Sequence, residues 1–444
     1  MAEADTETKQ RLNDPKVANA EKLARWSIDP HRDVNSIPLA ELDPGHPDLF
    51  EADTFWPYFE RLRREDPVHY VENSMFGPYW SLSKFEDCMY VDTHHELFSS
   101  DNMRGGISLG GRPIKEGEQV DPTYSLPMFI MTDPPKHDEQ RMVVAPMFAP
   151  RQIAGLEDVV RMRAGQILDN LPINEDFNWV QHVSVELTGQ MLATLFDIPQ
   201  EDRAKLIYWS DATQNLGNPE FFETVEEGFK VLWECAGYFL QVFEQRKKEP
   251  PKPDLISMLA HGSSTRDMPP NEFLGNILLL IVGGNDTTRN SISGGLLALN
   301  QFGDQYDKLR ANPKLAGNMV PEIIRWQSPV AHMARTAMVD TEVGGKQIKA
   351  GDRVAMWYIS ANRDETAIPN AGQFIIDRPN ARHHMAFGFG IHRCLGNRLG
   401  ELQLRLIWEE LMKRYPKIEV VGDPKYLKSS FIHGIRELPV RIRK

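Results

Sequence analysis

The chain has 444 residues, of which 41% are hydrophobic, so it is long enough to bury a large core. Its 63 acidic and 50 basic residues give a formal net charge of −13, which argues against nucleic acid or an anionic membrane surface as a partner. The three cysteines are too far apart for a disulfide framework, and the charged N-terminal residues resemble neither a signal peptide nor a membrane anchor, so we expect a cytoplasmic protein.

The N-terminal part of the chain predicts an extension followed by a small mixed region. Residues 1–45 are polar and punctuated by Asp and Pro, which predicts an N-terminal extension to one domain that spans residues 46–444. This extension either lies on the domain or is partly disordered. Residues 55–64 are expected to form a helix. The segments 69–72 and 79–82 alternate between apolar and polar residues around a Phe-Gly-Pro turn, which predicts a β-hairpin.

A long loop and a series of helices are expected next. Residues 101–121 carry five glycines without periodicity, so they form either a disordered surface loop or a loop with a function. Asp133 followed by two prolines predicts a helix that begins with an Asp cap. On that helix His137 and Arg141 are four residues apart and therefore share one face. From residue 151 to about residue 249 the chain is predicted to be mostly helical.

A long helix is predicted from the prolines at residues 269–270 to about residue 300, which corresponds to a length of roughly 45 Å. Its middle carries Gly283, Gly284, Asp286 and Thr287 in an otherwise apolar stretch. Gly and Thr are poor helix formers, and Gly lets a ligand approach the backbone. A tolerated kink would explain the glycines alone, but an acid beside a hydroxyl in so apolar a helix indicates chemistry at this point.

Beyond this helix a charged pair and several short strands are predicted. Glu322 and Arg325 are three residues apart on a helix, a spacing that usually makes a weak surface ion pair. The pattern then changes to alternating segments, which predict a small β region. The expected strands are residues 335–339, 342–343, 347–348 and 353–358.

The segment 387–396 has two glycines spaced by one residue, then Cys394, and leads into a helix predicted over residues 397–414. Free amides and the dipole at a helix start lower the pKa of a thiol and favour the thiolate. Gly396 would let a flat group lie against the helix start. A fixed thiolate beside a flat apolar surface is what an axial ligand of haem iron requires, whereas the alternative is a buried structural cysteine.

This segment resembles the cysteine-ligand signature of the cytochrome P450 haem-thiolate monooxygenases. The signature positions are filled by Phe387, Gly388, Gly390, His392, Cys394 and Gly396. Residues 283–288 resemble the oxygen-activation motif of the same family, and Glu322 with Arg325 resembles its Glu-x-x-Arg motif. The resemblance covers roughly residues 46–444. It implies a mainly α, single-domain P450 fold with a small β region, and a b-type haem whose iron is axially ligated by Cys394.

The resemblance also implies roles for individual residues. Asp286 and Thr287 would be the proton-delivery pair, and Glu322, Arg325 and Arg378 would form a buried structural network. Haem contacts are expected from His137, Arg141, Gly283, Arg335, His384, Phe387, Arg393 and Gly396. The substrate pocket is expected to be lined by Leu126, Met128, Phe129, Val282, Gly283, Val330, Ala331, Met333, Phe431 and Ile432. The family usually carries an acid where this chain has Gln403, so we expect a local change in ion pairing.

A closer resemblance concerns the substrate. Residues 76–81, 178–180, 281–290 and 323–327 look like the soluble bacterial alkane ω-hydroxylases of this superfamily. That group oxidises the terminal methyl of medium-chain alkanes, and often fatty acids or alcohols. The alternatives are a terpene or steroid substrate, a haem-thiolate sensor, or a peroxide-driven hydroxylase. The pair Asp286 and Thr287 argues against the last two.

The same resemblance implies redox partners. The group takes its electrons from a small 2Fe-2S ferredoxin, which an NADH-dependent ferredoxin reductase reduces. Arg393 and Arg398 flank Cys394 and would form a local basic patch for an acidic ferredoxin, despite the negative net charge of the chain. Two solvated arginines without a partner are the alternative.

Overall fold

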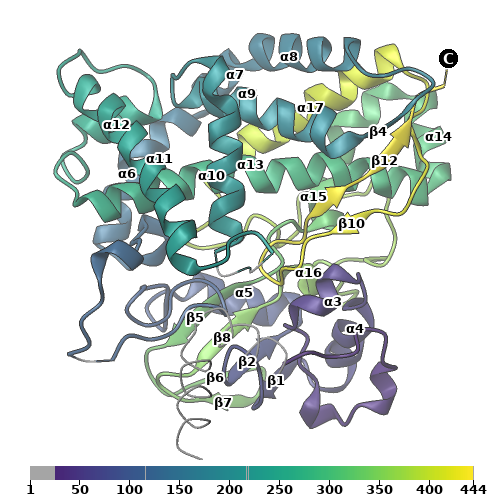
Figure 1. Cartoon of the computed structure of the whole chain (residues 1–444). Helices are drawn as coiled ribbons and strands as arrows, with labels where there is room; N and C mark the ends of the chain where they lie inside the picture. The colour runs from purple at the N-terminus through teal and green to yellow at the C-terminus, as the bar shows by residue number, and fades with distance from the viewer. Residues whose placement is uncertain (1–25, 116, 217, 219, 444) are drawn as a thin grey trace, which may run out of the picture.

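The long helix α13 (Pro270–Gln301) runs through the middle of the molecule, and other helices pack around it (Figure 1). This computed structural model describes residues 26–115, 117–216, 218 and 220–443. Most side chains of α13 are buried, because other helices contact it from several sides. The predicted central helix is therefore confirmed, with ends within about two residues of those expected.

The described helices agree with the mainly α prediction, and both the helix expected at residues 55–64 and the one at 397–414 are present. The remaining α-helices are α3 (Pro47–Glu51), α4 (Trp56–Glu65), α5 (Phe85–Thr93), α6 (Lys136–Val144), α7 (Pro150–Gly155), α8 (Glu157–Asp169), α9 (Glu186–Leu195), α10 (Arg203–Gln214), α11 (Val225–Arg246), α12 (Leu255–His261), α14 (Gly303–Ala311), α15 (Ala316–Gln327), α16 (Tyr358–Ala361) and α17 (Asn397–Arg414). Short helical turns are η1 (Val34–Ser36), η2 (Leu39–Glu41), η3 (Pro122–Tyr124), η4 (Phe129–Met131), η5 (Ala145–Phe148), η6 (Val180–Val185), η7 (Gln200–Asp202) and η8 (Pro313–Leu315).

A five-stranded sheet lies in the lower part of Figure 1, beside α3, α4 and α5, in the order β1-β2-β8-β5-β3. The predicted hairpin forms its edge, with Val68 opposite Leu82, and β2 then pairs in parallel with β8. Its strands are β1 (Val68–Val71), β2 (Tyr79–Leu82), β3 (Phe98–Ser99), β5 (Met333–Ala337) and β8 (Arg353–Met356). Three smaller sheets pair β6 (Thr341–Val343) with β7 (Lys346–Ile348), β10 (Lys425–Tyr426) with β11 (Ile435–Glu437), and β12 (Pro439–Arg441) with both β4 (Asp176–Asn178) and β9 (Glu419–Val420).

Part of the predicted N-terminal extension packs into the domain. Val34, Ile37 and Leu42 are buried in one hydrophobic cluster with residues of α3 and α4. These apolar side chains are few and separated by polar residues, which explains why composition alone did not assign them to the domain. Residues 1–25 of the predicted extension lie outside the described residues.

The glycine-rich loop at residues 101–121 lies against the five-stranded sheet. Ile107 and Leu109 are buried, and the Ile107 carbonyl oxygen accepts a hydrogen bond of 2.7 Å from the Ala334 amide. The predicted Asp cap of α6 is wrong. The Asp133 carboxylate instead accepts hydrogen bonds from the Ser99 hydroxyl and the Ser100 amide, so it ties α6 to the loop after β3.

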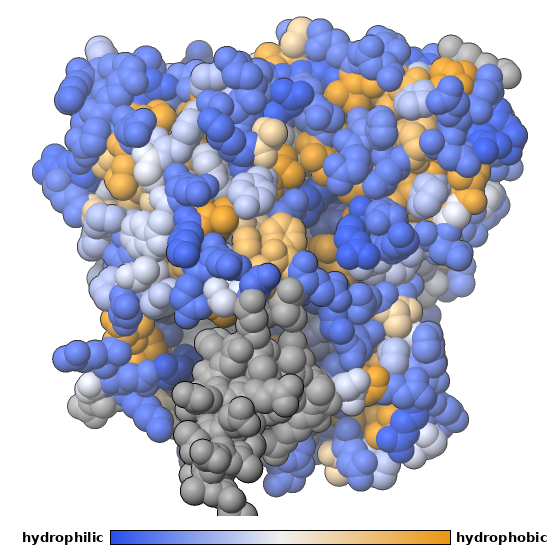
Figure 2. All heavy atoms as spheres, in the orientation of Figure 1, coloured by the Kyte–Doolittle hydropathy of each residue, from blue (hydrophilic) through white to orange (hydrophobic). Residues whose placement is uncertain are grey.

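The surface agrees with the composition, in which 25% of the residues are charged. The face in Figure 2 is mostly hydrophilic, with apolar side chains gathered near its centre. Across the described part of the chain, none of the helices combines the length and the apolar character that a membrane crossing requires.

Candidate active site

The loop that carries Cys394 is held in a sharply bent conformation. Gly388 and Gly390 both have a φ of +64°, a backbone region that other residues rarely adopt. A Cβ at Gly390 would collide with the carbonyl oxygen of Asp92, so this glycine also allows the loop to pack against the end of α5. The Cys394 amide donates a hydrogen bond of 2.8 Å to the Phe387 carbonyl oxygen, which closes the loop just before α17 begins.

The thiol of Cys394 opens onto a cleft, whereas Cys88 and Cys235 are buried. Opposing effects act on the pKa of this thiol. Burial raises the pKa of the Cys394 thiol, while the backbone amides of Gly396 and Asn397 and the charge of Arg141 oppose this effect. The amides at the helix start thus lower the pKa as expected, while removal of the thiol from water acts in the opposite direction. A coordinated cation deprotonates such a thiol outright.

One face of α13 forms the wall of the cleft opposite this loop. Helical spacing brings seven residues of α13 to it, namely Leu279, Leu280, Gly283, Gly284, Thr287, Thr288 and Ser291. A Cβ added to Gly283 would meet no atom within 4 Å, so this glycine leaves open space beside the helix. The Thr287 hydroxyl donates a hydrogen bond of 2.9 Å to the Gly283 carbonyl oxygen, the back-bonding that bends helices.

Four of the ten predicted pocket residues line the cleft: Phe129, Gly283, Val330 and Met333. The other six do not: Leu126, Met128, Val282, Ala331, Phe431 and Ile432. Two of these exclusions have a simple geometric reason. Ala331 follows Val330 in an extended segment, so its side chain points the other way, into the cluster that contains Trp357. Val282 precedes Gly283 on α13 and is rotated away from the cleft by the helical period.

Cationic and imidazole groups gather at one part of the cleft. Arg141, Arg335 and His392 line it, and the His137 ring packs against His392 with centroids 4.2 Å apart. The Nε2 atom of His137 and both ring nitrogens of His392 have no hydrogen-bond partner among the described residues, although they are buried. Buried polar atoms are rarely left unpaired, so these three nitrogens indicate a polar group of a ligand.

Three predicted haem contacts do not line the cleft. One is His137, which packs against the lining residue His392. His384 is buried outside the cleft lining, and its Nδ1 atom accepts a hydrogen bond of 3.2 Å from the Ala386 amide. The Arg393 side chain is exposed, while its carbonyl oxygen accepts a hydrogen bond from Arg141. Phe387 and Gly396 do line the cleft.

These features fit a haem. Cys394 supplies a thiol at one wall, and Gly283 leaves space at the opposite wall. One ring nitrogen of His392 can donate to a carboxylate, and Nε2 of His137 can do so when that ring is protonated, because its Nδ1 already donates to Asp138. Arg141 and Arg335 add positive charge beside them. A carboxylate entering an otherwise apolar cleft needs such partners, since burying an unpaired charge is costly.

The structure separates the predicted proton-delivery pair. Thr287 lines the cleft, but Asp286 is fully buried on another side of α13, where it forms an ion pair with Arg289 and accepts a hydrogen bond of 3.1 Å from Ser210 of α10. Arg289 also pairs with Asp211, whose side chain is partly exposed. Burial raises the pKa of Asp286, and the positive charge of Arg289 opposes this. Asp286 therefore lies on the side of α13 that faces α10, and the next residue in the chain, Thr287, lies on the side that faces the cleft.

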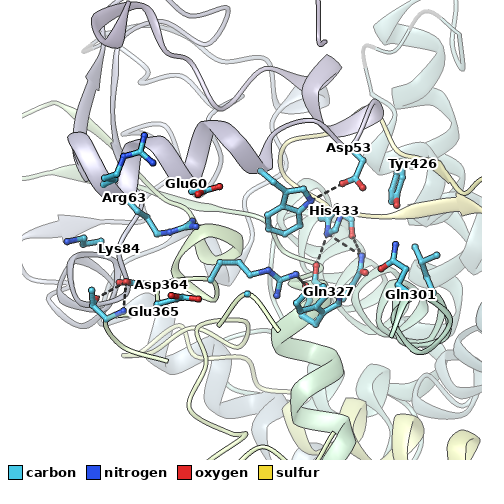
Figure 3. A pocket seen from close by; sticks show the side chains of 18 residues that line it. Asp53, Glu60, Arg63, Lys84, Gln301, Gln327, Asp364, Glu365, Tyr426 and His433 are labelled. Carbon is cyan, nitrogen blue, oxygen red and sulfur yellow. Dashed lines mark hydrogen bonds between the residues drawn. The ribbon is translucent and has the colours of Figure 1, made fainter. Parts of the chain in front are cut away.

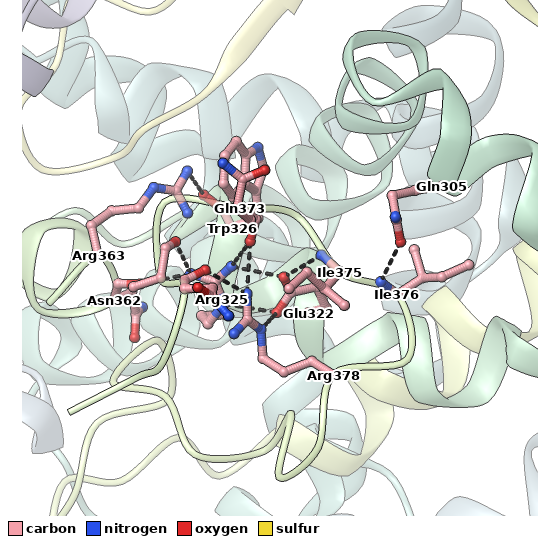
Figure 4. A network of polar contacts seen from close by, with 12 residues as sticks. Gln305, Glu322, Arg325, Trp326, Asn362, Arg363, Gln373, Ile375, Ile376 and Arg378 are labelled. Atoms are coloured by element: carbon pink, nitrogen blue, oxygen red, sulfur yellow. Dashed lines mark hydrogen bonds and ion pairs between the residues drawn. The ribbon is translucent and has the colours of Figure 1, made fainter. Parts of the chain in front are cut away.

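The structure brings together the three residues of the predicted structural network (Figure 4). The Glu322 carboxylate pairs with Arg325 at 2.7 Å and with Arg378 at 2.9 Å, and all three side chains are buried. The two guanidinium groups also donate to carbonyl oxygens of residues 362–373, and Glu322 accepts from the Ile375 amide. This network fixes the irregular chain between α16 and the Cys394 loop.

Replacing Glu322 by glutamine is expected to lower the free energy of unfolding by about 3–5 kcal/mol, because two buried guanidinium groups lose their counter-charge. Thermal unfolding of the purified variant measures the effect. The matched control is Glu401→Gln, which breaks the exposed pair with Arg382 and is expected to cost only about 0–1 kcal/mol. Equal stability losses in the two variants would contradict the structural role of Glu322.

A surface cleft of about 710 Å³ lies elsewhere on the molecule (Figure 3). It is formed by α4, the ends of α13 and α15, and the C-terminal segment, and charged side chains such as Glu60 and Arg63 line it. No predicted site residue lines this cleft. The internal cleft at Cys394 is the candidate site, since it alone of the two contains the predicted iron ligand.

Sequence reasoning missed several residues of the cleft. His392 was assigned only to the signature, and its position two residues before Cys394 could have placed it in the site. Thr288 and Ser291 follow Gly284 and Thr287 at helical spacing, which is the signal for a shared face. Gln403 lines the cleft with a buried Oε1 atom that has no partner among the described residues, so its effect is not limited to ion pairing.

Comparisons with known proteins agree with this site. The family model for Cytochrome P450 matches residues 308–430. The chain is 36% identical to linalool 8-monooxygenase of Pseudomonas putida, over 90% of this chain and 98% of that protein. It is 32% identical to the methyl-branched lipid omega-hydroxylase of Mycobacterium tuberculosis, over 91% of this chain and 95% of that protein.

Solved structures show the same likeness along the whole domain. CYP153D17 from Sphingomonas sp. is 48% identical, with a TM-score of 0.83 over 90% of this chain and 98% of that one. The predicted single-domain fold and the haem-thiolate cofactor are thereby confirmed. The chain belongs to the cytochrome P450 family of haem-thiolate monooxygenases.

Proposed function

We propose that this monooxygenase hydroxylates the terminal methyl group of medium-chain alkanes, fatty acids or related linear chains. The observation that carries the proposal is the composition of the cleft beside Thr287. Phe129, Ile130, Leu280, Val330 and Met333 are all apolar. Among the described residues that line the cleft, the arginines are Arg141 and Arg335, and no Asp, Glu or Lys is present. An apolar chain is thus favoured over a polar substrate.

The names of the relatives support hydroxylation at a terminal methyl group, with a terpene as the second candidate substrate. One curated relative is named as an omega-hydroxylase of a methyl-branched lipid, and another is named as a linalool 8-monooxygenase. Product analysis with octane tests the proposal, and the terminal alcohol is the expected product. Turnover of linalool without turnover of octane would favour the second candidate.

The haem, when bound, activates dioxygen so that one oxygen atom enters a substrate C–H bond and the other leaves as water, after uptake of two electrons and two protons. The protein must supply one route for the electrons and another for the protons. We propose that a 2Fe-2S ferredoxin, reduced by an NADH-dependent ferredoxin reductase, delivers the electrons. Arg393 and Arg398 are exposed on either side of Cys394, where an acidic ferredoxin would dock.

Protons would enter through the side of α13 that faces α10. Asp211 is partly exposed, and Arg289 links it to the buried Asp286. A raised pKa keeps Asp286 nearer to protonation than an ordinary carboxyl, which suits a proton donor. The Thr287 hydroxyl lines the cleft and can hold a water there. Asp286 is therefore the relay, and Thr287 is the residue that acts within the cleft.

Two variants separate these roles. Thr287→Ala is expected to consume NADH at a rate near that of the wild type but to release more peroxide per product, because the variant lacks the hydroxyl that would hold a water in the cleft. Asp286→Asn is expected to lower kcat about tenfold or more with little change in substrate binding, because it acts after the substrate binds. Rates of NADH oxidation, peroxide release and product formation distinguish the two. Wild-type rate and coupling in both variants would place the relay elsewhere.

A further inference from the structure

Asp92, near the end of α5, is a buried carboxylate that contacts three elements around the cleft. One oxygen accepts a hydrogen bond of 2.8 Å from the Arg335 guanidinium of β5. The other oxygen accepts from the Tyr358 hydroxyl at 2.8 Å and from the Phe389 amide at 2.7 Å. Only 3% of Asp92 is exposed, so solvent does not screen these contacts.

Two of these partners line the cleft and the third belongs to the loop of the iron ligand. Arg335 and Tyr358 line the cleft, and Phe389 lies five residues before Cys394. The backbone of Asp92 also contacts the loop, because its carbonyl oxygen occupies the space where a Cβ of Gly390 would lie. The end of α5 thus touches the ligand loop through both its backbone and its side chain.

The charge of Asp92 matters as much as its contacts. Arg335 is 2% exposed, and its ion pair with Asp92 balances the guanidinium charge inside the protein. The remaining guanidinium contact is a hydrogen bond of 2.9 Å from Nη1 to the Ala334 carbonyl oxygen, which is neutral. Arg335 therefore lines the cleft as one partner of a buried ion pair.

We propose that Asp92 is a positioning residue for the haem. It orients Arg335 toward the cofactor, balances the charge of that arginine, and fixes the ligand loop through the Phe389 amide. The inference rests on the haem site described above, and it assigns to α5 a role that no motif in the chain indicates. The predicted consequence is electrostatic: the Asp92–Arg335 pair sets the reduction potential of the iron.

The sign of this effect follows from charge. Asp92→Asn keeps the size of the side chain but leaves the positive charge of Arg335 unbalanced, which favours the ferrous over the ferric iron and raises the midpoint potential. Arg335→Gln leaves the negative charge of Asp92 unbalanced and lowers the potential. The double variant removes both charges and is expected to return the potential toward that of the wild type.

The experiment is spectroelectrochemical titration of the haem-loaded full-length protein and its variants. Tyr358→Phe is the matched control, since it removes one hydrogen bond to Asp92 without changing any charge, and its potential is expected to equal that of the wild type. The wild type must first show the Soret band of a thiolate–CO complex. Absence of that band would overturn the haem site itself, which is a separate outcome.

Opposite shifts in Asp92→Asn and Arg335→Gln, with recovery in the double variant, support the proposal. A wild-type potential in Asp92→Asn, or shifts of the same sign in both single variants, overturns it. If Asp92→Asn loses haem but the double variant retains it, the proposal is also supported, because the balance of charge between residues 92 and 335 is then what retains the cofactor. Loss of haem from both Asp92→Asn and the double variant overturns the proposal.

Discussion

Replacing Cys394 by serine is expected to abolish the strongly red-shifted Soret band that the reduced wild-type protein shows with CO. The thiol of Cys394 faces the cleft, and a serine hydroxyl is too weakly acidic to replace the thiolate that would hold the iron of a bound haem. Monooxygenase turnover should fall by at least about a thousandfold, which corresponds to roughly 4 kcal/mol in activation free energy. The CO difference spectrum and the rate of product formation measure the two effects.

The two other cysteines provide the controls. Cys88 and Cys235 are buried in hydrophobic clusters and neither lines the cleft, so Cys88→Ser and Cys235→Ser are expected to keep the Soret band. Burial raises the pKa of both thiols well above the ordinary value, which makes them poor iron ligands. An unchanged spectrum in Cys394→Ser would show that the ligand is another residue.

Replacing Gly283 by phenylalanine is expected to block turnover while leaving the haem bound. A Cβ at this position points into open space of the cleft beside Thr287, so a phenyl ring would fill the volume that the substrate needs. The Cys394 loop at the opposite wall is unchanged, and the CO spectrum should keep its Soret band. Product formation from octane should drop below detection, and the haem content of the purified variant should stay near that of the wild type.

Gly283→Ala is the matched control for this variant. One methyl group fits without contacts under 4 Å, and an alanine stabilises a helix interior by about 0.5–1 kcal/mol relative to glycine. We therefore expect a folded protein that still turns over linear substrates. Wild-type turnover in Gly283→Phe would mean that the substrate does not approach the iron along this face of α13.

Strong local signals explain which elements could be predicted. The ends of α17 match the expected residues 397–414, because a glycine-rich loop precedes the helix and its interior is regular. The hairpin β1–β2 also matches, since a turn separates two alternating segments. The last expected strand is shorter than predicted: β8 ends at Met356, and Tyr358 begins the short helix α16.

Contacts between distant segments explain what could not be predicted. Asp133 binds the loop at Ser99 instead of capping its own helix, and Asp92 reaches residues that lie more than two hundred positions away. Neither partner is visible from local spacing. The orientation of Asp286, in contrast, could have been predicted, because helical periodicity separates it from Thr287 by roughly 100°.

The most direct test of the proposed function is product analysis of octane oxidation by gas chromatography, with ferredoxin, ferredoxin reductase and NADH supplied. A terminal C–H bond is stronger than its internal neighbours, so terminal attack requires a cleft that admits only the chain end. A difference of about 1.4 kcal/mol between the competing transition states gives tenfold selectivity.

We predict mostly terminal alcohol from the wild type, and a larger share of internal alcohols from Val330→Ala, which removes two methyl groups from the cleft lining. Mostly internal alcohols from the wild type would contradict the proposed ω-hydroxylation. Efficient turnover of a terpene or steroid, together with no turnover of any linear chain, would also contradict it.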